Sequence, residues 1–237
     1  MSRIEVIGNA TLILGDCREF LNGLQEAAQC VLTDPPFGIG YSSGYQTKTL
    51  WSETTIRGDK STALRDEVLT ALAPLPTLAF GSRKAAEPPG TRAVLIWDKG
   101  PALGMGALDI PWKPSWEEIY VLGKGFVGAR DEGAVIYCPP VQSMAKNGRL
   151  HPNEKPVKLL RRLMQKLPPG TVADPFMGSA STAEACIMEG RTFIGCEVDE
   201  NYFEIACRRA ETAQRQTDLF LRQPIPRMTM TLEEETS

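Results

Sequence analysis

Residues 171–181 read Thr-Val-Ala-Asp-Pro-Phe-Met-Gly-Ser-Ala-Ser, and residues 192–196 read Thr-Phe-Ile-Gly-Cys. The apolar start of the first stretch and the whole of the second predict short strands, and the residues from about Ser181 to Glu189 predict a helix. A further helix is expected to begin at Asp199. Strand, helix, strand, helix is the pattern of a parallel crossover, which is right-handed by rule. This part of the chain therefore predicts an α/β fold.

The rest of the chain extends the same pattern. Short apolar runs separated by glycine and proline give further strand candidates at 11–14, 30–33, 77–80, 93–97, 119–122 and 134–137. Helices are expected up to Leu24, over 66–73 and from Pro156, after which an apolar stripe follows at Leu160, Leu163, Met164 and Leu167. We expect one α/β domain over residues 1–216, with a mixed seven-stranded sheet and helices on both faces, and a flexible tail over 217–237.

The composition is that of a folded globular protein, with 237 residues, 42% hydrophobic and 23% charged. No apolar run approaches the roughly 18 to 20 residues of a membrane helix, and the amino terminus lacks the plan of a secretory signal. We therefore expect a cytoplasmic protein that does not enter a membrane. The formal charge of −3 does not mark a nucleic-acid binder, but it does not exclude one, because binding needs only a local basic surface.

The six cysteines predict no metal site. None of them stands in a Cys-x-x-Cys pair, and the chain has a single histidine to join them. We therefore expect no zinc and no other metal. Most of the thiols are expected to be small buried hydrophobic groups: Cys17, Cys30, Cys138, Cys186, Cys196 and Cys207.

Two tetrapeptides stand where predicted strands end. Asp34-Pro35-Pro36-Phe37 follows the run at 30–33, and Asp174-Pro175-Phe176-Met177 follows the run at 171–173. Parallel strands present their carboxyl ends at one edge of a sheet, which is where α/β proteins bind ligands. The sequence therefore predicts one site built from both tetrapeptides.

The turn after Asp174 predicts an adenosine-containing ligand. Small residues between a strand and a helix leave backbone N–H groups at the helix start, where an anionic group can bind. Glu197 ends the next strand 19 residues after Gly178, the offset at which a carboxylate meets the ribose hydroxyls of an adenosine cofactor. NAD fits this pattern as well, although Gly178-Ser179-Ala180 lacks the three-glycine fingerprint, and a simple strand-turn-helix connection stays open.

The first tetrapeptide has the chemistry to bind an exocyclic amine of a nucleic-acid base. Such an amine is a weak nucleophile because its lone pair is delocalised into the ring. A carboxylate and a backbone carbonyl that accept its two N–H groups would favour a pyramidal nitrogen, and two prolines supply carbonyls with fixed φ. An aromatic residue such as Phe37 offers a face on which a flipped base can stack.

Together these motifs resemble the S-adenosylmethionine-dependent DNA amino-methyltransferases, in the group whose catalytic tetrapeptide precedes the cofactor motif. His151-Pro152-Asn153-Glu154-Lys155-Pro156 is similar to their His-Pro-x-x-Lys-Pro element, Gly195-Cys196-Glu197 to their ribose-binding strand end, and Gly15-Asp16-Cys17 to the segment that meets the adenine amino group. The similarity is good over 11–40 and 151–210 and looser over 94–99 and 112–126, where Trp-Glu-Glu-Ile-Tyr resembles small phage-type members. The resemblance implies a Rossmann-like methyltransferase fold.

The resemblance also implies the roles of individual residues. Asp34, Pro35, Pro36 and Phe37 would be catalytic. The residues expected to bind S-adenosylmethionine are Asp16, Cys17, Asp34, His151, Lys155, Asp174, Phe176, Gly178, Ser179, Ala180, Ser181, Glu197 and Val198. The expected activity is site-specific methylation of the N6 amino group of adenine in double-stranded DNA, in a bacterium or a phage-infected host cell, and relatives of this motif order often pair as homodimers.

Four alternatives stay open. N4-cytosine methylation is one, although those members more often begin the tetrapeptide with serine. A second is methylation of RNA or of a protein amide. Ala180 stands where the family usually has a third glycine, which costs about 1 kcal/mol or more if φ is positive there, so an inactive DNA-binding relative is a third. A nucleotide oxidoreductase is the most distant. Carbon-5 methylation is not favoured, because Cys138 precedes its prolines.

DNA contacts are expected on two stretches of the chain. A polar segment at 41–62, which we expect to be a mobile loop, carries cations and aromatic side chains, and 124–150 would hold a short target-recognition segment. A solvated charged loop is the alternative for both. The candidate DNA-binding residues are Tyr45, Lys48, Trp51, Arg57, Lys60, Lys146 and Arg149.

Overall fold

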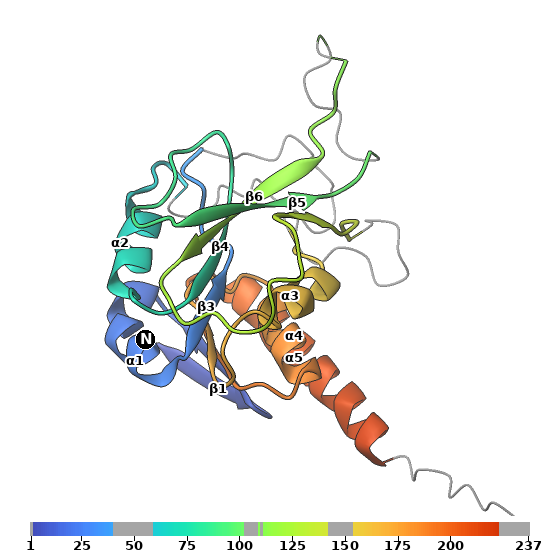
Figure 1. The fold of residues 1–237 in the computed structure, drawn as a ribbon. Helices are drawn as coiled ribbons and strands as arrows, with labels where there is room; N and C mark the ends of the chain where they lie inside the picture. Colours follow the sequence, from blue (N-terminus) through green and yellow to red (C-terminus); the bar gives the residue numbers. More distant parts are fainter. Residues whose placement is uncertain (1, 40–58, 102–108, 110, 142–153, 223–237) are drawn as a thin grey trace, which may run out of the picture.

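The computed structural model describes residues 2–39, 59–101, 109, 111–141 and 154–222. In these residues nine strands form one sheet in the order β1-β2-β9-β8-β3-β4-β6-β5-β7, with helices on both faces (Figure 1). The strands are β1 (Arg3–Ile7), β2 (Ala10–Leu14), β3 (Cys30–Thr33), β4 (Thr77–Gly81), β5 (Ala93–Asp98), β6 (Trp116–Leu122), β7 (Val135–Tyr137), β8 (Val172–Asp174) and β9 (Phe193–Glu197). The α/β fold with a mixed sheet is confirmed.

The helices divide between the two faces of the sheet. Helices α1 and α2 cover one face, and α3, α4 and α5 cover the other (Figure 1). Side chains alternate along each strand, so Leu32 of β3 packs toward α3–α5 while its neighbour Val31 packs toward α1 and α2. The helices are η1, a 3-10 turn (Cys17–Phe20), α1 (Leu21–Ala27), α2 (Ala63–Ala71), α3 (Val157–Met164), α4 (Ser181–Met188) and α5 (Glu200–Arg222).

Strand direction brings distant parts of the chain to one edge. Strands β2, β9, β8, β3 and β4 run parallel. Their carboxyl ends therefore share an edge. Strand β6 is antiparallel to β4 and β5, so its amino end, at Trp116, lies at the same edge. A site at this edge can draw on the ends of five parallel strands and on the start of β6.

The expected count of seven strands is too low. All eight runs that we named form strands, and β1 adds a ninth. Strand β1 pairs with β2 in an antiparallel hairpin, with Ile7 opposite Ala10 and a turn of two residues, Gly8 and Asn9. Gly8 has φ +60°, which glycine adopts at little cost. The Gly-Asn pair between two apolar runs is a hairpin signal that the sequence did contain.

The helices agree with expectation in place but differ at their ends. Helix α2 begins three residues before the expected start at residue 66. Helix α5 continues to Arg222, past residue 217, where we expected the tail to begin. No proline or glycine interrupts this stretch before Pro224, so nothing in the sequence stops the helix earlier. None of the helices described here is long and apolar enough to cross a lipid bilayer.

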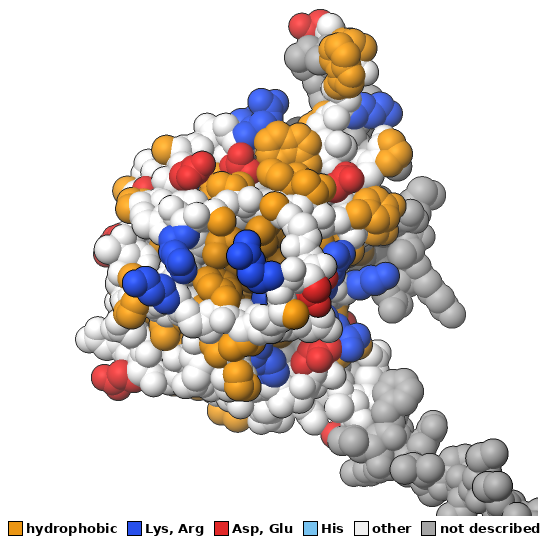
Figure 2. Space-filling view, viewed as in Figure 1, with side chains coloured by type: hydrophobic (Ala, Val, Ile, Leu, Met, Phe, Trp, Pro, Cys, Tyr) orange, Lys and Arg blue, Asp and Glu red, His pale blue; other side chains and the backbone are white. Residues whose placement is uncertain are grey.

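The surface near β5, β6 and β7 is unusually apolar. In Figure 2 hydrophobic side chains gather near the top of the molecule, over β5 and β6. Strand β7 is at the end of the sheet, so its outer edge pairs with no further strand of the described structure. The exposed large hydrophobic residues of this region are Trp112, Trp116, Val135 and Tyr137.

Candidate active site

Four acidic residues lie at the carboxyl ends of four neighbouring parallel strands. Asp16 follows β2, Asp34 follows β3, and Asp174 and Glu197 are the last residues of β8 and β9. All four line one cavity of about 630 Å³ at this edge of the sheet. The volume is within the range of small-molecule sites. The prediction that the two tetrapeptides meet in one site is confirmed.

The turn after β8 is held by its own aspartate. Asp174 is buried, and its Oδ1 accepts a hydrogen bond from Thr33 Oγ1 at 2.6 Å and from the Phe176 N–H at 3.1 Å. Burial raises the pKa of Asp174 to about 6, and these hydrogen bonds offset the shift only in part. Asp174 therefore shapes the turn and ties β8 to β3, while Phe176, Gly178, Ser179 and Ser181 line the cavity.

Ala180 adopts the conformation that its position demands of glycine. Its φ is +60° and its ψ is +40°, and it is the only non-glycine residue of the described chain with positive φ. The residue is fully buried in the core that α3, α4 and α5 form with the sheet. Unlike its neighbours, it is not among the residues that line the cavity. The extra methyl group therefore packs in the core and does not narrow the site.

Glu197 is a carboxylate held by backbone groups. Its Oε1 accepts a hydrogen bond from the Asp199 N–H at 2.8 Å, and its backbone carbonyl accepts one from the Gly15 N–H at 2.8 Å. Burial raises the pKa of Glu197 to about 7, although backbone N–H groups of Asp199, Val198 and Gly178 lower it in part. The side chain is half-buried at the cavity wall, beside the turn that follows β8.

Asp16 caps the turn that follows β2. Its Oδ1 accepts the Arg18 N–H at 3.0 Å, and its Oδ2 forms an ion pair of 2.6 Å with the Arg18 guanidinium. The Arg18 side chain lowers the pKa of Asp16. Next to it, burial raises the pKa of the Cys17 thiol to about 12, so the thiol is neutral. This wall of the cavity therefore carries the Asp16 carboxylate, whose ionised form Arg18 favours, and the neutral Cys17 thiol.

The catalytic candidate Asp34 is held by the lysine of the His-Pro-x-x-Lys-Pro element. Lys155 Nζ lies 2.6 Å from Asp34 Oδ2. Asp34 Oδ1 is buried and has no hydrogen-bond partner among the described residues. The lysine is 5% exposed, and its Nζ lies 5.7 Å from the ring centre of Phe37 and 4.9 Å from that of Phe80. Lys155, expected on the cofactor, lines the cavity and contacts Asp34 of the Asp-Pro-Pro-Phe tetrapeptide.

Two further charged residues complete this cluster and were missed from the sequence. Glu117, near the start of β6, forms ion pairs with Lys155 at 3.5 Å and with Lys99. Lys99, just after β5, also lies over the Trp97 ring. The Trp-Glu-Glu-Ile-Tyr run marked this region as similar to phage-type members, but only the antiparallel register of β6 shows which glutamate faces the site.

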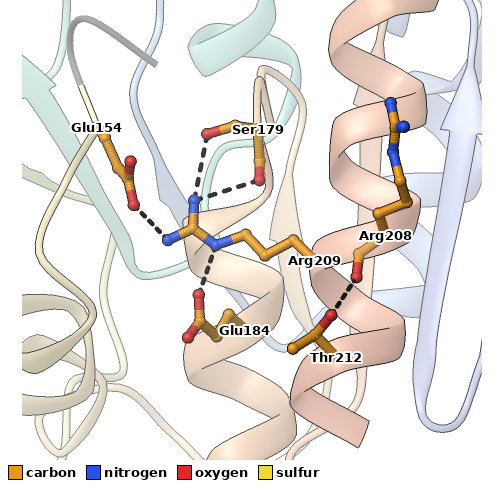
Figure 3. Close-up of polar contacts among 6 residues, drawn as sticks. All are labelled: Glu154, Ser179, Glu184, Arg208, Arg209 and Thr212. Carbon is orange, nitrogen blue, oxygen red and sulfur yellow. Dashed lines mark hydrogen bonds and ion pairs between the residues drawn. The ribbon is translucent and has the colours of Figure 1, made fainter. Parts of the chain in front are cut away.

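A buried arginine on α5 was also missed. The Arg209 guanidinium binds Glu154 Oε1 at 2.5 Å, Glu184 on α4, and Ser179 Oγ at 3.3 Å (Figure 3). Arg209 is only 8% exposed. It joins the cofactor turn, α4 and the residue before Lys155 to one helix. Its neighbour Arg208 points away from this cluster in Figure 3, and no sequence pattern distinguishes the two arginines.

The structure brings together most of the residues proposed for the site. Those that line the cavity are Asp16, Cys17, Asp34, Pro35, Pro36, Phe37, Lys155, Asp174, Phe176, Gly178, Ser179, Ser181, Glu197 and Val198. Lys60 is exposed in the turn before α2. His151 and the other DNA-binding candidates lie outside the described residues: Tyr45, Lys48, Trp51, Arg57, Lys146 and Arg149.

Residues 38 and 39, just after the tetrapeptide, contact Asp59 in the described end of the expected loop at 41–62. Asp59 is buried, and its Oδ1 accepts hydrogen bonds from the N–H groups of Gly38 at 2.7 Å and Ile39 at 3.4 Å. The described part of the segment at 124–150 includes β7, which belongs to the central sheet.

The cysteines pack as expected. All six are buried and unpaired by disulfides. Cys138 is 5% exposed, and its carbonyl accepts the Trp97 Nε1–H at 2.7 Å. It lies at the end of β7 and does not line the cavity.

Comparison with known proteins gives the family. The model of a family described as DNA methylase, N6_N4_Mtase, matches residues 94–208, which include Glu117, Lys155 and the turn after β8. Over these residues the chain is similar to the N6/N4 DNA methylases, which supports an amino-methyltransferase of the N6/N4 type. The turn after β8, the acidic strand ends and the Asp-Pro-Pro-Phe tetrapeptide line one cavity.

Individual relatives agree with this assignment. YubD of Escherichia coli K12, which carries the name of a methylase, is 29% identical over 225 residues, covering 86% of this chain and 91% of YubD. YhdJ of the same organism, a DNA adenine methyltransferase, is 36% identical over 83 residues, or 34% of this chain and 28% of YhdJ. The longer match thus spans nearly the whole methylase, and the second spans one segment.

Solved structures with low sequence identity establish the fold. PvuII DNA methyltransferase, described as cytosine-N4-specific, superposes with a TM-score of 0.60 and 16% identity, covering 92% of this chain and 93% of that one. M1.HpyAVI in complex with SAM gives 0.58 and 19% identity, covering 84% of this chain and 98% of that one. The fold is the Rossmann-like methyltransferase fold.

S-adenosylmethionine, the cofactor of this family, fits the residues present. Its adenosine needs acceptors for ribose hydroxyls and for an amino group, and Glu197 and Asp16 supply carboxylates at two places on the cavity wall. Gly178 has φ +52°, and a side chain there would point into open space. The backbone can therefore approach a ligand closely at this turn.

Proposed function

We propose that this chain transfers a methyl group from S-adenosylmethionine to the N6 amino group of adenine in double-stranded DNA. The observation that carries the proposal is Asp34 Oδ1, a buried carboxylate oxygen without a hydrogen-bond partner among the described residues. It belongs to a cavity that the cofactor turn also lines. Buried acceptors are nearly always satisfied in folded proteins, so this oxygen marks the place of a missing donor.

An exocyclic amine is the donor that fits. One N–H of the amine would bind Asp34 and the other the Pro35 carbonyl, which favours a pyramidal nitrogen whose lone pair is free. S-adenosylmethionine supplies a methyl group on a positively charged sulfur. The nitrogen lone pair forms the new N–C bond as the C–S bond breaks. The electron pair of the C–S bond remains on sulfur. The methylated amine then loses one proton. Positioning supplies most of the rate enhancement in such a displacement.

We assign the cofactor-binding roles along the cavity wall. Glu197 accepts the ribose hydroxyls, Asp16 accepts the adenine amino group, and the backbone of Gly178 and Ser179 approaches the methionine part. Support comes from their shared cavity and from the turn that Asp174 and Arg209 hold in place. Further members of this set are Cys17, Phe176, Ser181 and Val198, with His151 as a proposal from sequence alone.

The preference for adenine rests on the tetrapeptide. It begins with Asp34, a carboxylate, whereas cytosine-N4 members more often begin with serine. The segment shared with YhdJ, which is named as an adenine methyltransferase, is 36% identical. Both observations favour adenine N6 as the acceptor.

The target base must leave the duplex to reach Asp34. Its amine is paired in double-stranded DNA, and enzymes that act on a base therefore flip it out of the stack. Phe37, partly buried at the cavity, offers a stacking face. Near the cavity, Lys84 and Lys60 are exposed cations that would contact phosphates, in addition to the candidates at 45–57 and 146–149.

Methyl transfer with product analysis tests the proposal. The full chain is incubated with S-adenosylmethionine carrying a labelled methyl group and with unmethylated double-stranded DNA, and the DNA is digested to nucleosides. We expect the label in N6-methyladenine. Label in N4-methylcytosine would overturn the choice of base, and DNA binding without any transfer would favour an inactive relative. Parallel incubations replace the DNA with RNA or with protein, and label in either of these but not in DNA would overturn the choice of substrate.

A further inference from the structure

We propose that Glu117 and Lys99 are positioning residues of the active site, which act on Asp34 through Lys155. The inference rests on the proposed function, in which Asp34 accepts the target amine. None of the sequence motifs assigns these two residues a role, and they come from the ends of two antiparallel strands, β5 and β6.

The contacts form a chain of four alternating charges. Asp34 Oδ2 lies 2.6 Å from Lys155 Nζ, Lys155 Nζ lies 3.5 Å from Glu117 Oε2, and Glu117 Oε1 binds Lys99. Their side chains are between 5% and 27% exposed. The chain therefore begins at the catalytic carboxylate and ends at the lysine beside Trp97.

The two oxygens of the Asp34 carboxylate have different surroundings. Lys155 holds Oδ2, so the carboxylate cannot rotate freely, and Oδ1 is left without a partner in the described structure. A carboxylate fixed in this way presents one oxygen to the incoming amine. Glu117 supplies a second carboxylate near the buried ammonium group of Lys155, which also lies over the rings of Phe37 and Phe80.

The charges shift the pKa values of three of these groups. Burial lowers the pKa of Lys155, but Asp34 and Glu117 outweigh burial and the net shift is upward. Burial raises the pKa of Glu117, but Lys155 and Lys99 outweigh it and the net shift is downward. For Asp34, burial raises the pKa, Glu117 adds to the rise, and Lys155 offsets it only in part.

The network therefore predicts shifts of opposite sign. The charged groups that face Asp34 are Lys155 before α3, Glu117 on β6, Lys99 after β5 and Asp174 on β8. Removing a cation should make Asp34 harder to ionise, and removing the Glu117 charge should make it easier. Substitution of a residue with only a structural role would not shift the Asp34 pKa upward for a lost cation and downward for a lost carboxylate.

A carbon-13 NMR titration of the aspartate carboxyl groups tests the proposal without turnover. It uses the full 237-residue chain, and the Asp34 signal is assigned by its loss in Asp34→Asn. In Lys155→Gln we expect the Asp34 midpoint to rise by about 1 to 3 pH units. In Lys99→Gln we expect a smaller rise, and in Glu117→Gln a fall. The matched control is Glu118→Gln, the next residue on β6, whose carboxylate accepts the Tyr120 hydroxyl on the other face of the sheet.

Activity gives the second readout. The acidic limb of the kcat/KM profile should move in the same order as the Asp34 midpoint, and Glu117→Gln should lose about 10- to 100-fold in kcat at its optimal pH. If Lys155→Gln does not fold, Glu117→Gln and Lys99→Gln decide the question by their opposite signs. A midpoint that stays in place or rises in Glu117→Gln overturns the proposal. Should the wild type transfer no methyl group, the proposed function fails, while the titration still decides the role of Glu117.

Discussion

At the scale of single residues, the proposed role of Glu197 links cofactor binding to pH. Its carboxylate must be ionised to accept two ribose hydroxyls, yet burial raises its pKa to about 7 in the free protein. Below pH 7, protonation of Glu197 therefore competes with cofactor binding. Asp16 does not add to this effect, because Arg18 lowers its pKa.

We expect the affinity for S-adenosylmethionine to fall as the pH is lowered through 7, approaching about a tenfold loss per pH unit below the Glu197 pKa. Calorimetric titration between pH 5.5 and 8.5 measures it. Glu197→Gln should bind more weakly at pH 8 and show a flatter dependence on pH. An affinity that stays constant from pH 8 to pH 6 in the wild type would contradict this role.

The raised pKa of Glu197 also makes the stability of the fold depend on pH. Its pKa in the folded chain lies above the unfolded value of about 4.3, so the folded state holds the extra proton between the two values. Stability from this group is therefore greatest below the unfolded pKa and is lost as the pH rises through about 7. Bound cofactor would supply hydroxyl donors and offset that loss.

Ala180 shows how one residue can depart from a family pattern. The sequence predicted strain if the position needs positive φ, and φ is +60°. The structure adds that the alanine methyl group lies in the core, where burial of a methyl-sized group contributes about 0.8 kcal/mol. This gain is similar in size to the cost of the left-handed conformation. The departure is thus compatible with an intact cofactor turn.

At the scale of elements, α5 contributes the buried side chain of Arg209 to the surroundings of the site. Arg209 joins the helix to Glu154, Glu184 and Ser179 (Figure 3). Its loss would leave two carboxylates without their cation, and Glu154 is only 5% exposed. Breaking a buried ion pair on one side is strongly destabilising, because the remaining charge is poorly solvated.

Arg209→Gln should lower the free energy of unfolding by about 3 kcal/mol or more and weaken S-adenosylmethionine binding, because Ser179 loses an anchor. Denaturant titration and calorimetry measure the two effects. The control is Arg208→Gln, the next residue, whose exposed side chain bonds the carbonyl of Glu204 on its own helix. Equal effects of the two substitutions would contradict a specific role of Arg209 in stability and cofactor binding.

The register of β6 explains why sequence reasoning stopped short at this scale. Glu117 and Glu118 are adjacent and chemically identical, and only pairing with β4 and β5 tells which face each occupies. In contrast, Gly8-Asn9 was a readable signal for β1, and the proline-free run to Pro224 was a readable signal for the length of α5. Local signals were therefore available for the elements, but not for the partners of their side chains.

At the scale of the whole molecule, the parallel strands bring the acidic residues of the candidate site together. Asp16, Asp34, Asp174 and Glu197 end four strands that are neighbours in space and far apart in the chain. Their convergence follows from strand ends that the sequence marks clearly with acids and prolines. The contact between Asp34 and Lys155, 121 residues apart, needed the three-dimensional structure.

The separation of tasks at this edge is the feature on which the proposed reaction depends. In the proposed function, the cofactor-binding residues lie at the ends of β2, β8 and β9 and the amine-binding tetrapeptide follows β3, so one role can fail while the other stays intact. Asp34→Ala should therefore separate binding from chemistry. It removes the acceptor of the target amine but leaves the turn after β8 and the Glu197 wall unchanged.

The most direct measurement compares Asp34→Ala with the wild type in two assays on the same preparations, calorimetric binding of S-adenosylmethionine and single-turnover methyl transfer to duplex DNA. We predict that the variant keeps most of its affinity for the cofactor and transfers at least about 100-fold more slowly, as expected for loss of a group that contacts the reacting amine. Transfer at the wild-type rate by Asp34→Ala would contradict the assignment of the amine to this carboxylate.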